Sequence, residues 1–186
     1  MRFFLFGPPT LKRDGKTVAI DARKTEALLA YLAMSGTSHS RETLMTLLWP
    51  DLELKRAQNV LRRNLSTLNK ALDGQWLVID GDVVGLDKDA DVALDVERFR
   101  QLAASGQDHD HAKSEPCDQC LQDLVEAADV YTADFLAGFG VRNSVNFDNW
   151  QRLEMQQLQR EFAAVLERLV AGYSARQAYG QAMDYA

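Results

Sequence analysis

The stretch ELKRAQNVLRRNLSTLNKAL, residues Glu53 to Leu72, carries the strongest periodic pattern in the chain. Its apolar residues recur every three or four positions, which is typical of the buried face of an amphipathic helix. We expect this stripe to consist of Leu54, Ala57, Leu61, Leu65, Leu68 and Leu72. Asp73-Gly74 follows and supplies the glycine that often ends a helix. We therefore predict one long helix here.

The other face of this helix is cationic, with no acidic residue between Leu54 and Leu72. Such a face suits a polyanion, and Arg and Asn can form paired hydrogen bonds with guanine and adenine edges. The simpler alternative is a solvated surface helix, so the flanking elements must decide between this alternative and a nucleic-acid-binding helix. The candidate DNA-binding residues are Lys55, Arg56, Gln58, Asn59, Arg62, Arg63, Ser66 and Lys70.

The segments around this helix predict a winged helix-turn-helix. Residues 2–6 form an aromatic strand, and Asp14-Gly15 marks a hairpin turn. Helices are expected over residues 23–34 and 41–49, the second capped by Ser40 and ended by Pro50. After the cationic helix, residues 76–80 and 82–86 flank Asp80-Gly81, which predicts a second hairpin in the position of a wing.

Together these segments resemble a known family. They are similar to the OmpR-type winged helix of SARP-like bacterial transcriptional activators. The matching segments, within residues 2–99, are FLFG, KTEALLAYLA, SRETLMTLLWPD, AQNVLRRNLSTL and LDVERF. The resemblance covers about residues 2–92 and implies a transcriptional activator that binds double-stranded DNA and recruits RNA polymerase. The turn that would face the polymerase holds Trp49, Asp51 and Glu53, although Trp49 alone is better read as a core residue.

Within the cationic helix, the N-terminal half of a recognition helix usually contacts bases. We therefore assign base edges to Arg56, Asn59 and Arg63, and phosphates to Lys55, Arg62 and Lys70. The wing departs from the family pattern, because its tip is Asp80-Gly81-Asp82 and has no cation to enter a minor groove.

The second half of the chain predicts an all-α, tetratricopeptide-like domain. A helix is expected to begin at a cap formed by Asp95, others to cover residues 121–135 and 147–172, and a last one to cover 173–186. AADVYTADFLAGF, residues 127–139, resembles the start of the bacterial transcriptional activation domain. We divide the chain into residues 1–93 and 94–186. The family domain is longer, so the chain looks truncated, and its uncovered C-terminal helices could form a homodimer.

One cluster has the composition of a metal site. His109, His111, Cys117 and Cys120 supply the four ligands of a tetrahedral structural zinc, although their spacing is not that of a common zinc finger. Two alternatives stay open: a thioredoxin-type redox pair, which lacks a preceding strand, and two cysteines and two histidines without a shared role. His39 lies alone and is read as a surface residue.

Composition limits the other function classes. The net charge of −6 resides entirely in residues 96–186, so a nucleic-acid surface must be a local patch. The sequence holds no apolar run of membrane-span length, no secretory signal and few cysteines, which favours a reducing cytoplasm. It has no phosphate-binding loop or hydrolase motif, so we expect no enzyme and no required cofactor. The alternative function is a protein-interaction adaptor that has lost DNA binding.

Overall fold

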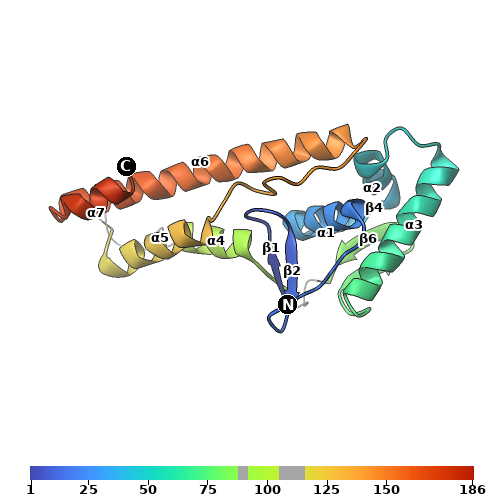
Figure 1. The fold of residues 1–186 in the computed structure, drawn as a ribbon, viewed down its shortest axis with the longest axis horizontal. Coiled ribbons are helices and arrows are strands. Elements are labelled where there is room, and N and C mark those ends of the chain that lie inside the picture. The colour runs from blue at the N-terminus through green and yellow to red at the C-terminus, as the bar shows by residue number, and fades with distance from the viewer. Residues whose placement is uncertain (88–91, 105–115) are drawn as a thin grey trace.

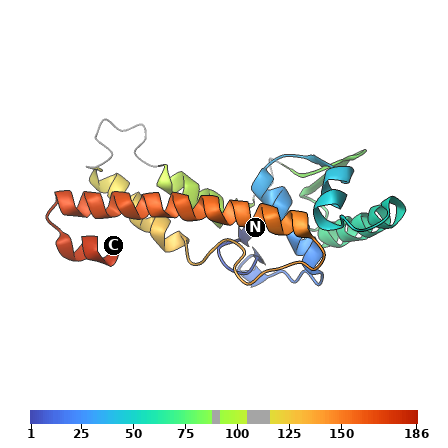
Figure 2. The ribbon, with the colours of Figure 1, turned by 90° about the horizontal axis from the view of Figure 1, so that it is seen from above.

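The computed structural model describes residues 1–87, 92–104 and 116–186. In this part of the chain, an N-terminal α+β half is followed by a helical half, as predicted (Figure 1). Helix α6 runs along most of the length of the molecule, from α7 at one end to α2 near the other (Figure 2).

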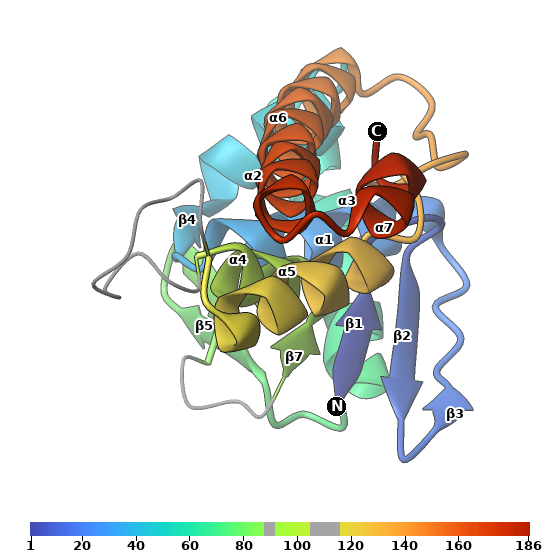
Figure 3. The same ribbon diagram turned by 90° about the vertical axis from the view of Figure 1, so that its left-hand side faces the viewer.

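The first sheet forms the platform. Its strand order is β3-β2-β1-β7, with β1 antiparallel to β2 and parallel to β7 (Figure 3). Asp14 and Gly15 connect β2 to β3 with φ angles of 48° and 77°, the left-handed geometry that a tight hairpin requires. This confirms the predicted turn. The strands are β1 (Arg2–Phe4), β2 (Thr10–Arg13), β3 (Lys16–Thr17) and β7 (Ala93–Leu94).

Three helices pack beside this sheet. The Ser40 hydroxyl accepts a hydrogen bond of 3.0 Å from the backbone N–H of Thr43, so it caps the second helix as predicted. In the third helix, Ala57, Leu61, Leu65 and Leu68 are buried, but Leu54 is 63% exposed. Leu54 was wrongly included in the buried stripe because it is the first residue of the helix and lies beyond the helices that cover the stripe. These helices are α1 (Arg23–Ser35), α2 (Arg41–Leu48) and α3 (Leu54–Ala71).

The wing is the second sheet, with strand order β4-β6-β5. Residues before α2 form one of its edge strands, in which His39 pairs with Val84 and Ser40 with Val83 on the central strand. The hairpin turn at Gly81 follows the predicted Asp80, and Asp80 pairs with Val83 across it. The strands are β4 (His39–Ser40), β5 (Leu77–Asp80) and β6 (Val83–Leu86).

His39 is half-buried, which corrects its reading as a surface residue. Its Nε2 lies 2.8 Å from the Ser35 hydroxyl, and its ring packs 4.8 Å from that of Tyr31. The sequence suggested a surface position because His39 precedes a helix among polar residues, whereas strand pairing turns it toward α1.

The helical half consists of an α4–α5 pair packed against α6, with α7 folded back beside the end of α6 (Figures 1 and 3). Two predicted boundaries were wrong. The helix expected over 121–135 ends at Val130, and the last segment is divided because α6 continues to Ala175 before the chain turns at Gln177, which has a φ of 58°. The helices are α4 (Asp95–Ala103), α5 (Asp118–Val130), α6 (Val145–Ala175) and α7 (Tyr179–Asp184).

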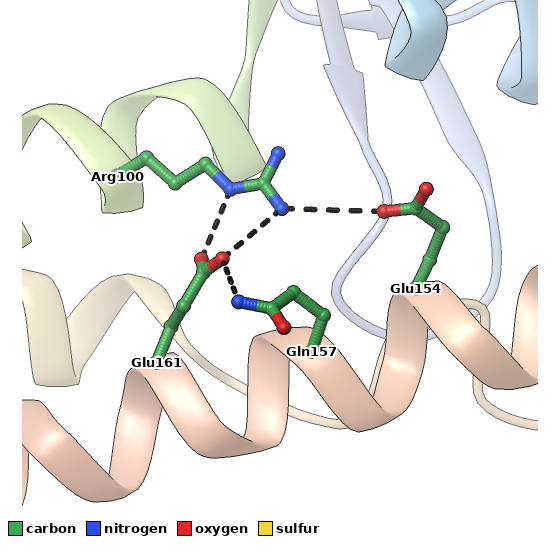
Figure 4. Close-up of polar contacts among 4 residues, drawn as sticks. All are labelled: Arg100, Glu154, Gln157 and Glu161. Carbon is green, nitrogen blue, oxygen red and sulfur yellow. Dashed lines mark hydrogen bonds and ion pairs between the residues drawn. The ribbon is translucent and has the colours of Figure 1, made fainter.

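An ion-pair cluster joins α4 to α6 (Figure 4). The guanidinium of Arg100 contacts both carboxylate oxygens of Glu161, at 3.0 and 3.3 Å, and lies 4.0 Å from Glu154. Gln157 donates a hydrogen bond of 3.0 Å to Glu161 and fixes its orientation. This two-point geometry orients α4 on α6 more specifically than a single contact would.

Asp95 connects the helical half to the platform. Its carboxyl oxygens accept hydrogen bonds from the backbone N–H groups of Leu5, Phe6 and Val96 at 2.8–2.9 Å. Asp95 is the first residue of α4, and Leu94 occupies the N-cap position. The capping prediction was therefore wrong by one position, because the carboxyl also has to reach the strand that ends nearby.

Candidate nucleic-acid interface

The outward face of α3 is the candidate interface. Its eight predicted DNA-binding residues, Lys55, Arg56, Gln58, Asn59, Arg62, Arg63, Ser66 and Lys70, are all exposed. An 18-residue helix is roughly 27 Å long and has the width of a B-DNA major groove. The structure therefore places these side chains on the exposed outer face of a single helix.

The helix lies at one end of the molecule, and α7 lies at the other (Figures 1 and 2). It packs on α1 and α2, and the described part of the helical half does not cover its outer face. Within the described residues, no carboxylate forms an ion pair with any of the five α3 cations. Arg62 instead donates a hydrogen bond of 3.1 Å to Asn59 on the same face. The cationic charge on this face is thus not neutralised by nearby acids.

A buried polar link fixes the inner side of α3. The hydroxyl of Thr25, which is fully buried, lies 2.7 Å from the side-chain oxygen of Asn64 and donates to it. Asn64 in turn donates to the backbone oxygen of Val60 at 2.8 Å. No motif in the sequence pointed to this pair. The available signal was an asparagine near the apolar stripe, where a polar side chain needs a partner.

The C-terminal end of α3 is held by the platform. Arg13 forms an ion pair with Asp73 and donates a hydrogen bond of 2.9 Å to the backbone oxygen of Ala71. A cation at this end also interacts favourably with the helix dipole. Gly74, with a φ of 72°, donates to the backbone oxygen of Asn69 and ends the helix where the sequence predicted.

The wing tip lies beside the start of α2. Arg41, which the sequence analysis did not select, donates from its backbone to Asp82 at 2.8 Å and from its side chain to Gly81 at 3.2 Å. The tip residues Asp80 and Asp82 are exposed. The strands behind them expose apolar side chains, with Val78, Ile79 and Val83 each more than 40% exposed. The wing surface is therefore acidic and apolar, and not basic.

The turn between α2 and α3 holds the three residues of the predicted polymerase contact, which differ in their exposure. Trp49 is 6% exposed and belongs to the core, whereas Asp51 and Glu53 are exposed. The ammonium of Lys24 lies 5.4 Å from the centre of the Trp49 ring. Burial lowers the pKa of Lys24, and the nearby carboxylate of Asp51 partly offsets this effect. Only the two acidic side chains are thus available to a partner.

The helical half contacts this turn from behind. The hydroxyl of Ser144 donates a hydrogen bond of 2.8 Å to the backbone oxygen of Leu48, and Asn146 donates to that of Thr46 at 2.8 Å. Ser144 is the N-cap residue of α6, so the start of the long helix is attached to the end of α2. The proposed boundary between residues 93 and 94 remains a prediction.

The predicted metal cluster is only partly described. His109 and His111 lie outside the described residues. The sulfur atoms of Cys117 and Cys120 are 3.4 Å apart at the start of α5. In the described part of the chain, no group of three or more His, Cys, Asp or Glu side chains could hold a metal. Structural zinc therefore stays a prediction that requires both histidines.

Comparisons with known proteins agree with the fold and the predicted family. The chain is 32% identical over 141 residues to the regulatory protein AfsR of Streptomyces coelicolor, which corresponds to 74% of this chain and 14% of AfsR. Its fold matches EmbR of Mycobacterium tuberculosis, solved in complex with a low-affinity phosphopeptide. That match has a TM-score of 0.71 at 18% sequence identity and covers 99% of this chain and 57% of the EmbR chain. Both likenesses support the resemblance to SARP-like activators that the sequence indicates.

The chain therefore spans a small part of AfsR and somewhat more than half of the EmbR chain. No family model matches it. In the part of the chain that the structure describes, every helix is too short or too polar to cross a bilayer.

Proposed function

We propose that this chain is a sequence-specific DNA-binding transcriptional regulator that acts in the cytoplasm. The proposal is carried by the outward face of α3, whose five cations are exposed and lack carboxylate partners within the described residues. The relationship to AfsR and the EmbR-like fold support it. In this arrangement α3 enters the major groove, where Arg56, Asn59 and Arg63 meet base edges and Lys55, Arg62 and Lys70 meet phosphates.

Binding to double-stranded DNA at several salt concentrations tests the proposal. Five cations that neutralise five phosphates give a slope of at most about −4.5 in log K against log salt. Arg62→Ala should make the slope shallower by about one unit and weaken all duplexes alike. Arg152→Ala is the matched control, because Arg152 pairs with Asn149 three residues earlier, as Arg62 does with Asn59, but lies on α6. No binding to any duplex at low salt would refute the proposal.

The finer proposal is activation through RNA polymerase. Asp51 and Glu53 are exposed beside the start of α3, so a bound regulator would present two carboxylates next to the DNA. Replacing both with Ala should abolish activation in a reconstituted transcription assay and leave duplex affinity unchanged or slightly higher. Equal activation by this variant would show that the polymerase contact lies elsewhere.

The alternative, a protein-interaction adaptor, is favoured by the wing. Val78, Ile79 and Val83 expose apolar surface beside two acidic tip residues, which would repel phosphates. An adaptor would fail to retard random duplex at low salt, whereas the regulator would retard it.

We also propose a homodimer through the C-terminal helices. Leu153 on α6 is 58% exposed, and Tyr179 and Met183 on α7 are 62% and 76% exposed. Sedimentation equilibrium of the wild type and of Met183→Glu tests this proposal, and a monomeric wild type at high concentration would refute it.

A further inference from the structure

Two sulfur atoms meet at the start of α5. Cys117 is the N-cap residue of this helix, Cys120 lies in its first turn, and their sulfurs are 3.4 Å apart. These are the only cysteines in the sequence, so no other thiol competes for either. A disulfide requires a separation of about 2.05 Å, which a modest side-chain rotation can provide from this starting distance.

The two cysteines differ in access. Cys117 is half-buried, whereas Cys120 is fully buried in the core. The positive end of the α5 dipole lies at Cys117 and favours negative charge there. An external disulfide can therefore reach the first sulfur, while the second is held behind it. This asymmetry suits stepwise exchange, in which one cysteine is attacked by or attacks the reagent and the other resolves the product.

Helix α6 holds this pair in position. Pro116, directly before Cys117, packs so closely on Gly172 that a Cβ at Gly172 would lie 2.8 Å from the proline Cγ. Arg176 donates to the backbone oxygen of Pro116 at 2.8 Å and pairs with Asp118 at 2.7 Å. The residues on both sides of Cys117, one through its backbone and one through its side chain, are therefore bound to the C-terminal part of α6. Forming or reducing a disulfide between Cys117 and Cys120 would therefore act directly on the contact between α5 and α6.

We propose that Cys117 and Cys120 are a reversible dithiol–disulfide site that exchanges with low-molecular-weight disulfides. The Cys117 sulfur, as its thiolate, attacks one sulfur of glutathione disulfide and releases the first glutathione thiolate. The Cys120 sulfur then attacks Cys117 in this mixed disulfide and releases the second glutathione, its proton passing to solvent. The protein loses two protons and two electrons in total, and one glutathione disulfide becomes two glutathione thiols. This inference is independent of DNA binding.

Thiol counting in defined glutathione buffers tests the site. The full chain should show two reactive thiols after denaturation when reduced and none when oxidised. Its mass should fall by two hydrogens without a glutathione adduct, and reduction should reverse the change. Oxidation that yields only glutathione adducts or covalent dimers would overturn the proposal.

Single variants test the order of the steps. Cys120→Ser should accumulate one glutathione adduct at Cys117, since no second thiol can resolve it. Cys117→Ser should react at least tenfold more slowly, because its remaining thiol is buried. Equal rates for the two variants would contradict the assigned roles. Stoichiometric zinc in the purified protein that blocks oxidation until a chelator is added would also overturn the proposal in favour of a structural metal site.

Arg176→Ala tests the role of α6. Without its hydrogen bond to Pro116 the two sulfurs are held together less firmly, so the ratio of oxidised to reduced protein in a fixed buffer should fall several-fold. Arg160→Ala, an exposed arginine 16 residues before Arg176 on the same helix, is the control and should leave the ratio unchanged. Thermal unfolding followed by circular dichroism verifies that both variants fold. An unchanged ratio in a folded Arg176→Ala would show that α6 does not position the pair.

Discussion

The buried hydroxyl of Thr25 on α1 donates a hydrogen bond of 2.7 Å to the side-chain oxygen of Asn64 on α3. This contact lies behind the cationic face of α3. Asn64 also donates to the backbone oxygen of Val60, one turn earlier in α3. The pair therefore fixes both the rotation of α3 about its axis and its position along that axis relative to the core. The orientation of the candidate DNA-binding residues thus depends on a residue that cannot contact DNA.

Thr25→Val should destabilise the protein by about 1–3 kcal/mol. The valine keeps the shape of threonine but leaves the Asn64 oxygen without its buried donor. Urea unfolding followed by circular dichroism measures the loss. Ser66→Ala, an exposed hydroxyl on the same helix, should change stability by less than about 0.5 kcal/mol. Similar losses of stability in both variants would show that the hydrogen bond between Thr25 and Asn64 makes no special contribution to the stability of the fold.

Asp95→Ala should cost about 2–3 kcal/mol, because the N–H groups of the buried residues Leu5 and Phe6, directly after β1, lose their carboxyl acceptor. Glu97→Ala is the control for the helix dipole, since Glu97 is an exposed acid in the same first turn. Guanidinium unfolding compares the two variants. If they lose the same stability, Asp95 acts only as a favourable charge at the helix terminus.

Base and phosphate contacts should separate in binding experiments. Asn59→Ala should cost about 1–3 kcal/mol on a selected duplex and little on random DNA, because only a base reader discriminates between sequences. Lys70→Ala should weaken both duplexes equally and reduce the salt dependence. Fluorescence anisotropy with both duplexes measures these effects. The reverse pattern would exchange the two assignments.

Acid should weaken the contact between the wing and α1. Burial lowers the pKa of His39 below its ordinary value of 6.5. The unfolded chain therefore takes up this proton at a higher pH than the folded chain. The stabilisation that the neutral His39 ring contributes to the folded protein is fully present above about pH 6.5. It is lost as the pH falls through the pKa of His39 in the folded state. The loss should be small, because His39 is only half-buried and solvent screens its charge.

His39→Gln should remove this step, which urea unfolding between pH 7.5 and 5.5 can detect. Carboxylates that titrate at lower pH contribute equally to both proteins, so the difference between the two profiles reports His39. Identical pH profiles would show that the half-buried ring is protonated equally well in both states.

Local patterns in the sequence were sufficient for the elements and for the winged-helix arrangement. Helical periodicity identified α3 and its outward cations, and Asp14-Gly15 and Asp80-Gly81 located the two hairpins. These features depend on interactions between near neighbours in the chain, so their signals are contained in short windows. Leu54 was misplaced because periodicity describes a helix face but not how far its covering partners extend.

The long-range contacts required the tertiary structure. Thr25 with Asn64, Asp95 with the first strand, and Ser144 with Leu48 are 39, 90 and 96 residues apart, and each depends on where separately formed elements meet. Partners at such separations leave no periodic signal, because packing alone brings their polar atoms within hydrogen-bond distance. The sequence alone thus defines a cationic helix and its neighbours, while the fold determines that this helix is rigidly held, uncovered and free to meet DNA.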